Sequence, residues 1–262
     1  MTPLAILGLT FALLLLPRLL LPSGRVGDSS ESVPIRSEVR GGLRLLWWVN
    51  RSFCVAIHRL VVIVPAPLPS SGPAILVCNH TSGIDNLILQ AGCDRVLGFL
   101  IAREFHEARF IGPIARLIGC IPVRRDGRDL TAAREALRAL EAGRVVPIFP
   151  EGRINPDSGR SFGPGKPGAA FLALRTEAPV IPAYIRGTPA TRSVWRAILT
   201  PSRTRVIFGP AIELSDLRQL QTLHEDRDRS VDRARTVEAT DRIMQAIRDL
   251  RDRSLALEPD AG

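Results

Sequence analysis

Residues 74–89 read AILVCNHTSGIDNLIL, and the architecture that we expect for the rest of the chain follows from them. The apolar run Ala74–Cys78 has the length of a buried strand, and it ends abruptly at a polar turn that carries His80. Asp85 follows the turn and opens a helical pattern of apolar residues. A strand end is a rigid mount for a base, and a carboxylate five residues later can fold back and orient the imidazole. This strand–turn–helix unit therefore makes His80 a candidate base and Asp85 its partner.

Alternating strands and helices extend outward from this unit. Short apolar or β-branched runs predict further strands, and amphipathic or apolar patterns predict helices between them. The predicted strands are 61–64, 96–102, 119–123, 145–149, 180–185 and 203–208, and the predicted helices are 43–58, 130–142 and 169–175, with an irregular helical stretch at 105–118. This order predicts an α/β fold, with a mixed central sheet flanked by helices.

The two ends of the chain differ from this body. The apolar run 4–21 approaches the length that spans a bilayer, so we interpret residues 1–22 as a membrane anchor, with a cleaved signal peptide as the alternative. The basic residues come after the run, which places the body on the cytoplasmic side of the cell membrane. Residues 23–40 are interpreted as a linker, residues 41–215 as the main domain, and residues 216–262 as a charged helical extension packed on it.

The predicted helix 43–58 alternates apolar and basic residues and contains adjacent tryptophans, Trp47 and Trp48. Paired tryptophans are typical of a membrane interface. A core helix with a basic outer face fits the same pattern, so both interpretations stay open.

The composition narrows the possible partners. The 262 residues carry a formal net charge of +9, which favours an anionic partner such as nucleic acid or anionic lipid. Aromatic residues are few and no nucleic-acid-reading motif is visible, so we expect no nucleic-acid partner. The four cysteines form no CxxC pair and lie in apolar segments, which indicates buried thiols in a reducing compartment and no metal site.

Two further polar groups follow predicted strands. Arg124 and Arg125 come after strand 119–123, and Glu151-Gly152-Arg153 come after strand 145–149. In open α/β sheets ligands gather at the carboxyl ends of strands, so these groups can share one cleft with His80. Adjacent arginines suit phosphate, and a glycine lets backbone N–H groups approach an anion. Solvated surface charge and a structural turn are the alternatives for the two groups.

These blocks together resemble the glycerolipid acyltransferase family, of the lysophosphatidic-acid acyltransferase type. Asn79-His80 and Asp85 match its NHxxxxD block, and residues 149–152, FPEG, match its third block. Residues 119–125, GCIPVRR, match the second block, and residues 180–184, VIPAY, match the fourth. The four blocks occur in the family's order within residues 43–210.

The resemblance implies that His80 is the general base, with Asp85 as its orienting partner. The acceptor's free hydroxyl would attack an acyl thioester of coenzyme A or acyl carrier protein, and no metal or redox cofactor is implied. Arg125, Glu151 and Gly152 would lie in the acceptor site, with the arginine holding the glycerol phosphate. The substrate-binding candidates that share these blocks or follow them are Asn79, Arg124, Arg153 and Lys166.

The chain departs from the family pattern after Gly152. The family usually reads EGTRS, whereas residues 151–155 are EGRIN, and Arg124 stands where an acidic residue is common. Both changes fall in the acceptor-binding blocks and leave the NHxxxxD block intact. The resemblance thus implies acylation of a lysophospholipid, 1-acyl-glycerol 3-phosphate first, at a membrane surface. The alternatives are another lyso-lipid such as lyso-ornithine lipid, a non-catalytic membrane lipid-binding protein, or a thioesterase.

Overall fold

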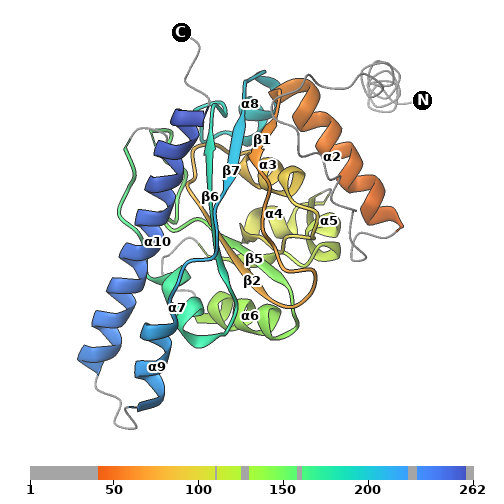
Figure 1. Ribbon diagram of the computed structural model, residues 1–262. Helices are drawn as coiled ribbons and strands as arrows, with labels where there is room; N and C mark the ends of the chain where they lie inside the picture. Colours follow the sequence, from red (N-terminus) through yellow and green to blue (C-terminus); the bar gives the residue numbers. More distant parts are fainter. Residues whose placement is uncertain (1–40, 110, 125–129, 158–160, 224–228, 258–262) are drawn as a thin grey trace. The chain divides into compact units, whose positions relative to one another are not determined.

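The centre of the molecule is a five-stranded mixed sheet with the strand order β1-β7-β6-β2-β5 (Figure 1). The computed structural model describes residues 41–109, 111–124, 130–157, 161–223 and 229–257. The strands are β1 (Val61–Val64), β2 (Ala74–Cys78), β5 (Val145–Ile148), β6 (Val180–Arg186) and β7 (Arg205–Phe208). β2 pairs in parallel with β5 and with β6, β1 is parallel to β7, and β6 and β7 are antiparallel. The predicted α/β class and mixed sheet are confirmed.

A second, two-stranded parallel sheet extends this arrangement beyond β5. It consists of β3 (Leu100–Ala102) and β4 (Ile121–Val123), and it connects to β5 through a parallel bridge between Leu97 and Val145. The predicted strand 96–102 is therefore shorter, because Leu97 and Gly98 contact β5 while regular pairing with β4 begins at Leu100.

Helices cover both faces of the sheet. On one face lie α2 (Gly42–His58), α3 (Asp85–Gly92) and α8 (Val194–Leu199), and on the other lie α6 (Leu130–Glu141), α7 (Gly168–Arg175), α9 (Ser215–Leu223) and α10 (Arg229–Leu257). Alternate residues of β2 divide between the two faces: Leu76 packs with the α2 and α3 side, and Ile75 with the α7 and α10 side. All five residues of β2 are buried, as a central parallel strand requires.

The irregular helical stretch predicted at 105–118 is two short helices, α4 (Arg103–Glu107) and α5 (Ile111–Leu117). The C-terminal helix α10 packs on β6 and α7, and it buries one apolar stripe, which includes Ile243 and Ile247. The predicted boundary between domain and extension falls at the start of α9, and it stays a prediction.

Helix α2 combines features of both sequence interpretations. Its inner face is fixed on α3, where Trp47 Nε1 donates to Cys93 O at 2.8 Å and Asn50 Nδ2 donates to Leu87 O at 2.9 Å. Arg51 also turns inward, bonds Ala91 O and lies over the Trp47 ring, so it does not belong to a basic outer face. The outer face carries exposed apolar side chains, those of Leu45, Leu46, Trp48, Val49 and Val55.

The predicted membrane anchor 1–22 and linker 23–40 lie outside the described residues. Among the residues that the structure describes, no helix has both the length and the apolar character needed to cross a bilayer.

Candidate active site

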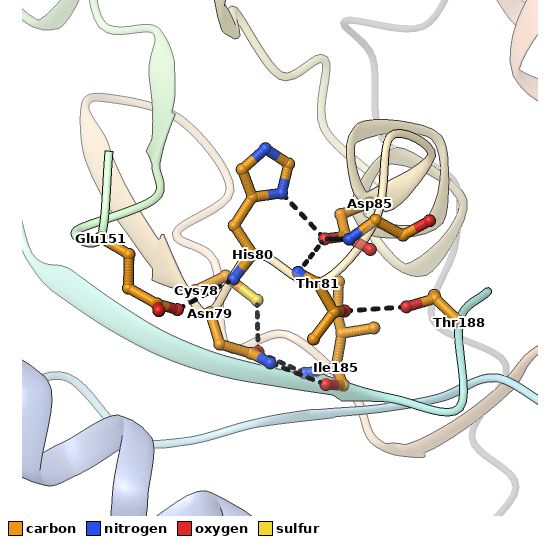
Figure 2. A network of polar contacts seen from close by, with 9 residues as sticks. Cys78, Asn79, His80, Thr81, Asp85, Glu151, Ile185 and Thr188 are labelled. Carbon is orange, nitrogen blue, oxygen red and sulfur yellow. Dashed lines mark hydrogen bonds and ion pairs between the residues drawn. The ribbon is translucent and has the colours of Figure 1, made fainter. Parts of the chain in front are cut away.

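The turn between β2 and α3 brings His80 and Asp85 into direct contact (Figure 2). His80 Nδ1 lies 2.8 Å from Asp85 Oδ2, and the same oxygen accepts the backbone N–H groups of Thr81 at 2.7 Å and Ser82 at 2.8 Å. Asp85 is the first residue of α3 and is 0% exposed. Its position at a helix N-terminus and its two backbone donors stabilise a carboxylate there. The predicted pairing of His80 with Asp85 is thus present in the structure.

This geometry fixes which nitrogen of His80 can act as a base. Because Asp85 accepts at Oδ2, Nδ1 carries the ring proton and Nε2 becomes the acceptor nitrogen. A carboxylate in this position also stabilises the imidazolium that forms when Nε2 takes a proton. The pair can therefore deprotonate a hydroxyl brought to Nε2.

The His80 ring is also held from its flat side. Phe149, directly after β5, stacks on the imidazole with a centroid distance of 3.9 Å and an interplanar angle of 11°. The backbone carbonyl of His80 accepts the N–H of Asn155 at 2.8 Å. The ring plane and the backbone of His80 are therefore positioned by the segment that follows β5.

Glu151 is the centre of a hydrogen-bond network in that segment. It is buried, and its Oε2 accepts from Asn155 Nδ2 and from Gly163 N, both at 2.9 Å. Its Oε1 lies 3.4 Å from the backbone nitrogen of His80, a long contact that Figure 2 shows beside the histidine. The structure thus brings Glu151 to His80, as predicted, and at least one of its oxygens is occupied by donors of the protein itself.

Gly152 and Lys166 lie together at the edge of the same network. Gly152 has φ +65°, a left-handed conformation that favours glycine, and its N–H donates to Phe149 O at 2.9 Å. A Cβ added to Gly152 would lie 2.6 Å from Lys166 Cδ, so the lysine side chain crosses directly over this glycine. Lys166 N donates to Pro150 O at 2.7 Å, which fixes where the lysine starts. An exposed ammonium group therefore lies against the turn next to His80.

The other predicted binding residues are placed as follows. Asn79 is buried, and both ends of its amide bond the backbone of Ile185, with Nδ2 to Ile185 O at 2.9 Å and Ile185 N to Oδ1 at 2.8 Å. It therefore joins the ends of β2 and β6. Arg153 is exposed in the turn after Glu151, and Arg124 is exposed directly after β4. Arg125 lies outside the described residues.

Three contacts of the site have no signal in the sequence pattern. Phe149 belongs to the FPEG block, but its stacking on His80 depends on the pairing of β2 with β5. Asn155 stands where the family pattern is broken, yet it bonds both His80 and Glu151. Thr81 Oγ1 lies 2.8 Å from Thr188 Oγ1, which connects the turn between β2 and α3 to the segment after β6.

The thiol beneath the turn is not suited to be a nucleophile. Burial raises the pKa of Cys78 well above its usual value, and the nearby carboxylates of Asp85 and Glu151 raise it further. A thiol held in its neutral form is a weak nucleophile. Cys78 is therefore a poor candidate for a reactive group, and His80 with Asp85 stays the candidate pair. Within the described residues, no group of three or more histidine, cysteine or acidic side chains is arranged to hold a metal.

Comparisons with known proteins agree with this arrangement. A family model described as Acyltransferase matches residues 59–186, which run from β1 to β6. A 1-acyl-sn-glycerol-3-phosphate acyltransferase of Bacillus subtilis (strain 168) is 24% identical over 155 residues, 58% of this chain and 73% of that protein. A chloroplastic 1-acyl-sn-glycerol-3-phosphate acyltransferase of Brassica napus is 32% identical over 124 residues, 46% of this chain and 35% of that protein.

A solved structure shares the fold. The crystal structure of the 1-acyl-sn-glycerophosphate (LPA) acyltransferase from Thermotoga maritima matches with a TM-score of 0.56 at 21% sequence identity, over 86% of this chain and 88% of that one. The family match includes the His80–Asp85 turn and the segment that holds it. Residues 59–186 of the chain match the acyltransferase family.

Proposed function

We propose that the protein transfers a fatty acyl group from an acyl thioester of coenzyme A or acyl carrier protein to the free hydroxyl of 1-acyl-glycerol 3-phosphate, giving phosphatidic acid. The observation that carries the proposal is the contact of 2.8 Å between His80 Nδ1 and the buried Asp85 Oδ2. His80 is the general base and Asp85 its orienting partner. The activities named for the similar Bacillus, Brassica and Thermotoga proteins support the same acceptor class.

The two nitrogens of His80 have different roles in the reaction. Nε2 accepts the proton of the lipid hydroxyl while the hydroxyl oxygen attacks the thioester carbonyl carbon, and Asp85 stabilises the imidazolium through Nδ1. The tetrahedral intermediate then collapses, the carbon–sulfur bond breaks, and the imidazolium returns the proton to the leaving thiolate. The ester and the free thiol are the products, and His80 ends as it began. General-base help of this kind contributes about 10²–10⁴ in rate.

The acceptor's phosphate is proposed to bind beside the Gly152 turn. Lys166 provides an ammonium group directly over Gly152, and Arg153 is exposed in the same turn. Arg124 follows β4, and parallel pairing from β4 through β3 and Leu97 to β5 brings the end of β4 to the same side of the sheet as the end of β5. Arg125, which lies outside the described residues, is proposed to hold the same phosphate. Several cations near one strand edge match the doubly charged glycerol phosphate.

The acceptor is a lipid, so the proposed reaction occurs at a membrane. We place the protein at the cell membrane, with the described residues on the cytoplasmic side. The exposed apolar side chains on the outer face of α2 support contact with lipid, because soluble surfaces rarely gather such groups on one helix.

A lyso-lipid with another head group is the second candidate acceptor. One observation favours it: Glu151 is bonded by Asn155, at the position where the sequence leaves the family pattern. This difference lies in the acceptor side of the site and does not touch the His80–Asp85 contact.

An acceptor panel tests the proposal. The full chain receives an acyl thioester together with 1-acyl-glycerol 3-phosphate, a neutral monoacylglycerol, lysophosphatidylcholine or a lyso-ornithine lipid, and products are identified by mass spectrometry. We expect phosphatidic acid to form fastest, and Lys166→Gln to raise the KM for the phosphate-bearing acceptor more than that for the thioester. Arg134→Gln, an exposed charge on α6, is the matched control and leaves both unchanged. Preference for another lyso-lipid would move the proposal to that acceptor, and release of free fatty acid alone would replace it with a thioesterase.

A further inference from the structure

The short helix α8 presents two large apolar side chains to solvent. Trp195 is 69% exposed and Leu199 is 79% exposed, and residues four positions apart lie on the same side of a helix. The opposite side of α8 is anchored, because Ala197 is buried in the core that α2 and α3 share. Ser193 caps the helix by accepting the N–H of Arg196 at 3.3 Å. The apolar pair is therefore held outward by a fixed helix.

The segment around α8 is strongly basic. From Ala178 to Ile212 the chain contains five arginines and no aspartate, glutamate or lysine. Arg192, Arg196 and Arg203 are exposed, and each lies within four residues of Trp195 or Leu199 in the sequence. An exposed tryptophan and leucine in a segment rich in exposed arginines match the interface of an anionic bilayer, where apolar side chains enter the acyl boundary and guanidinium groups meet phosphates.

The same segment is attached to the catalytic turn. Gly83 N donates to Thr191 O at 3.2 Å, and a Cβ added to Gly83 would lie only 2.9 Å from Val194 Cα. The hydroxyls of Thr81 and Thr188 are 2.8 Å apart, and Figure 2 marks this contact with a dashed line. The residues between His80 and Asp85 thus pack directly against the start of α8.

We propose that the surface formed by Arg192, Trp195, Arg196, Leu199 and Arg203, the α8 surface, inserts into an anionic lipid leaflet and holds the catalytic turn at the bilayer. The proposal rests on the proposed function in one respect, because a lipid acceptor gives a bilayer contact beside His80 its purpose. The α8 proposal goes beyond the proposed function because it assigns a membrane contact to a segment far in sequence from α2 and from the predicted anchor. A protein partner or a second copy of the chain is the competing occupant.

Site-specific fluorescence tests the contact. Leu199→Cys is labelled with a thiol-reactive environment-sensitive dye such as NBD, and Val237→Cys is the matched control, 54% exposed on α10, which covers the other face of the sheet. Labelling is selective because burial raises the pKa of all four native thiols. The full chain is reconstituted into vesicles of phosphatidylcholine alone or with phosphatidylglycerol. We expect a severalfold, blue-shifted rise in emission at position 199 with the anionic vesicles, and none at position 237.

Replacement of Arg192, Arg196 and Arg203 by glutamine tests the charge. Each arginine near an anionic leaflet contributes roughly a fivefold factor in partitioning, so the rise at position 199 should require much more anionic lipid in this variant. The matched variant replaces the exposed Arg134, Arg138 and Arg253, which lie on the helices of the other face, and should behave like the parent.

Two outcomes overturn the proposal. If the emission at position 199 does not change with anionic vesicles, or changes equally at positions 199 and 237, the α8 surface does not insert into the bilayer. A rise that appears without vesicles and grows with protein concentration assigns the α8 surface to a second copy of the chain. Neither readout requires catalysis, so acyl transfer measured in detergent micelles separates failure of this inference from failure of the proposed function.

Discussion

Replacement of Asp85 by asparagine separates the charge of this residue from its shape. Asp85 Oδ2 accepts three hydrogen bonds, from His80 Nδ1 and from the backbone nitrogens of Thr81 and Ser82. An asparagine oxygen in the same place can keep all three. Its NH₂ group then replaces Oδ1, which is buried and has no hydrogen-bond partner within the described residues. The substitution therefore keeps the turn, removes the negative charge and buries two amide donors.

The magnitude follows from these two changes. Burial of an amide without partners costs about 1–3 kcal/mol of stability. Without the carboxylate, the imidazolium that forms when Nε2 takes a proton loses its counter-charge. If Asp85→Asn removes most of the contribution of general-base catalysis, kcat should fall by a factor of roughly 10²–10⁴, which corresponds to an increase of about 3–5 kcal/mol in the activation free energy. The KM for either substrate should change little, because Asp85 is fully buried and its side chain contacts His80.

The assay is steady-state acyl transfer with wild type, Asp85→Asn, His80→Ala and the double variant. Groups that act as one unit are not additive, so the double variant should be about as slow as His80→Ala alone. Asp241→Asn, an exposed carboxylate on α10, is the control and should retain the wild-type rate. Urea unfolding checks that each variant is folded. A fall in kcat below tenfold for Asp85→Asn, or losses that add in the double variant, would refute the dyad.

Three further predictions concern the glycine turn, a buried histidine and the thiols. Gly152→Ala places a Cβ on a residue in the left-handed conformation, which costs about 1–2 kcal/mol of stability, and the new Cβ displaces Lys166, so the stability should fall and the KM for the acceptor should rise. Gly72→Ala is the control, because Gly72 has φ +83° but no atom within 4 Å of the added Cβ, and it should lower the stability without changing the KM. An unchanged acceptor KM for Gly152→Ala would disprove the role of Lys166. Burial lowers the pKa of His58 in the folded protein, so as the pH falls the unfolded chain takes up this proton at a higher pH than the folded protein does. The stability that the neutral His58 contributes is therefore fully present above about pH 6.5, and it is lost as the pH falls toward the folded-state pKa. Urea midpoints between about pH 7.5 and pH 5.5 should therefore fall further for wild type than for His58→Gln, and equal falls would contradict this. Burial raises the pKa of the four thiols, that of Cys54 to about 12. A thiol-reactive disulfide reagent near neutral pH should therefore react with no cysteine of the native protein and with all four after unfolding. Rapid labelling of the native protein would contradict this and show that the thiols are accessible.

The local units of the fold could be predicted because their residues are adjacent in sequence. The run Ala74–Cys78 is apolar at every position, which indicates a strand buried on both faces, and β2 is that strand. The contact between His80 and Asp85 spans five residues within one turn, so the spacing itself indicated it.

The remaining features depend on contacts between distant segments. Asn155 bonds the carbonyl of His80 only because β2 and β5 lie side by side, and no periodicity in the sequence encodes that pairing. Helix α8 has six residues, too few for a helical pattern to emerge, so Trp195 carried no signal before its exposure was known. Asn79 reads as a polar neighbour of a base, but its amide is used to join β2 to Ile185 of β6.

Acyl transfer by wild type and His80→Ala in parallel is the most direct test of the central claim, that His80 activates the hydroxyl of a lipid acceptor. The two proteins receive the same acyl thioester and 1-acyl-glycerol 3-phosphate, and mass spectrometry counts phosphatidic acid and free fatty acid. We predict phosphatidic acid from wild type, and a loss of roughly 10²–10⁴ in its rate of formation in His80→Ala, while urea unfolding confirms that the variant is folded. Phosphatidic acid formed by folded His80→Ala at the wild-type rate would contradict the claim.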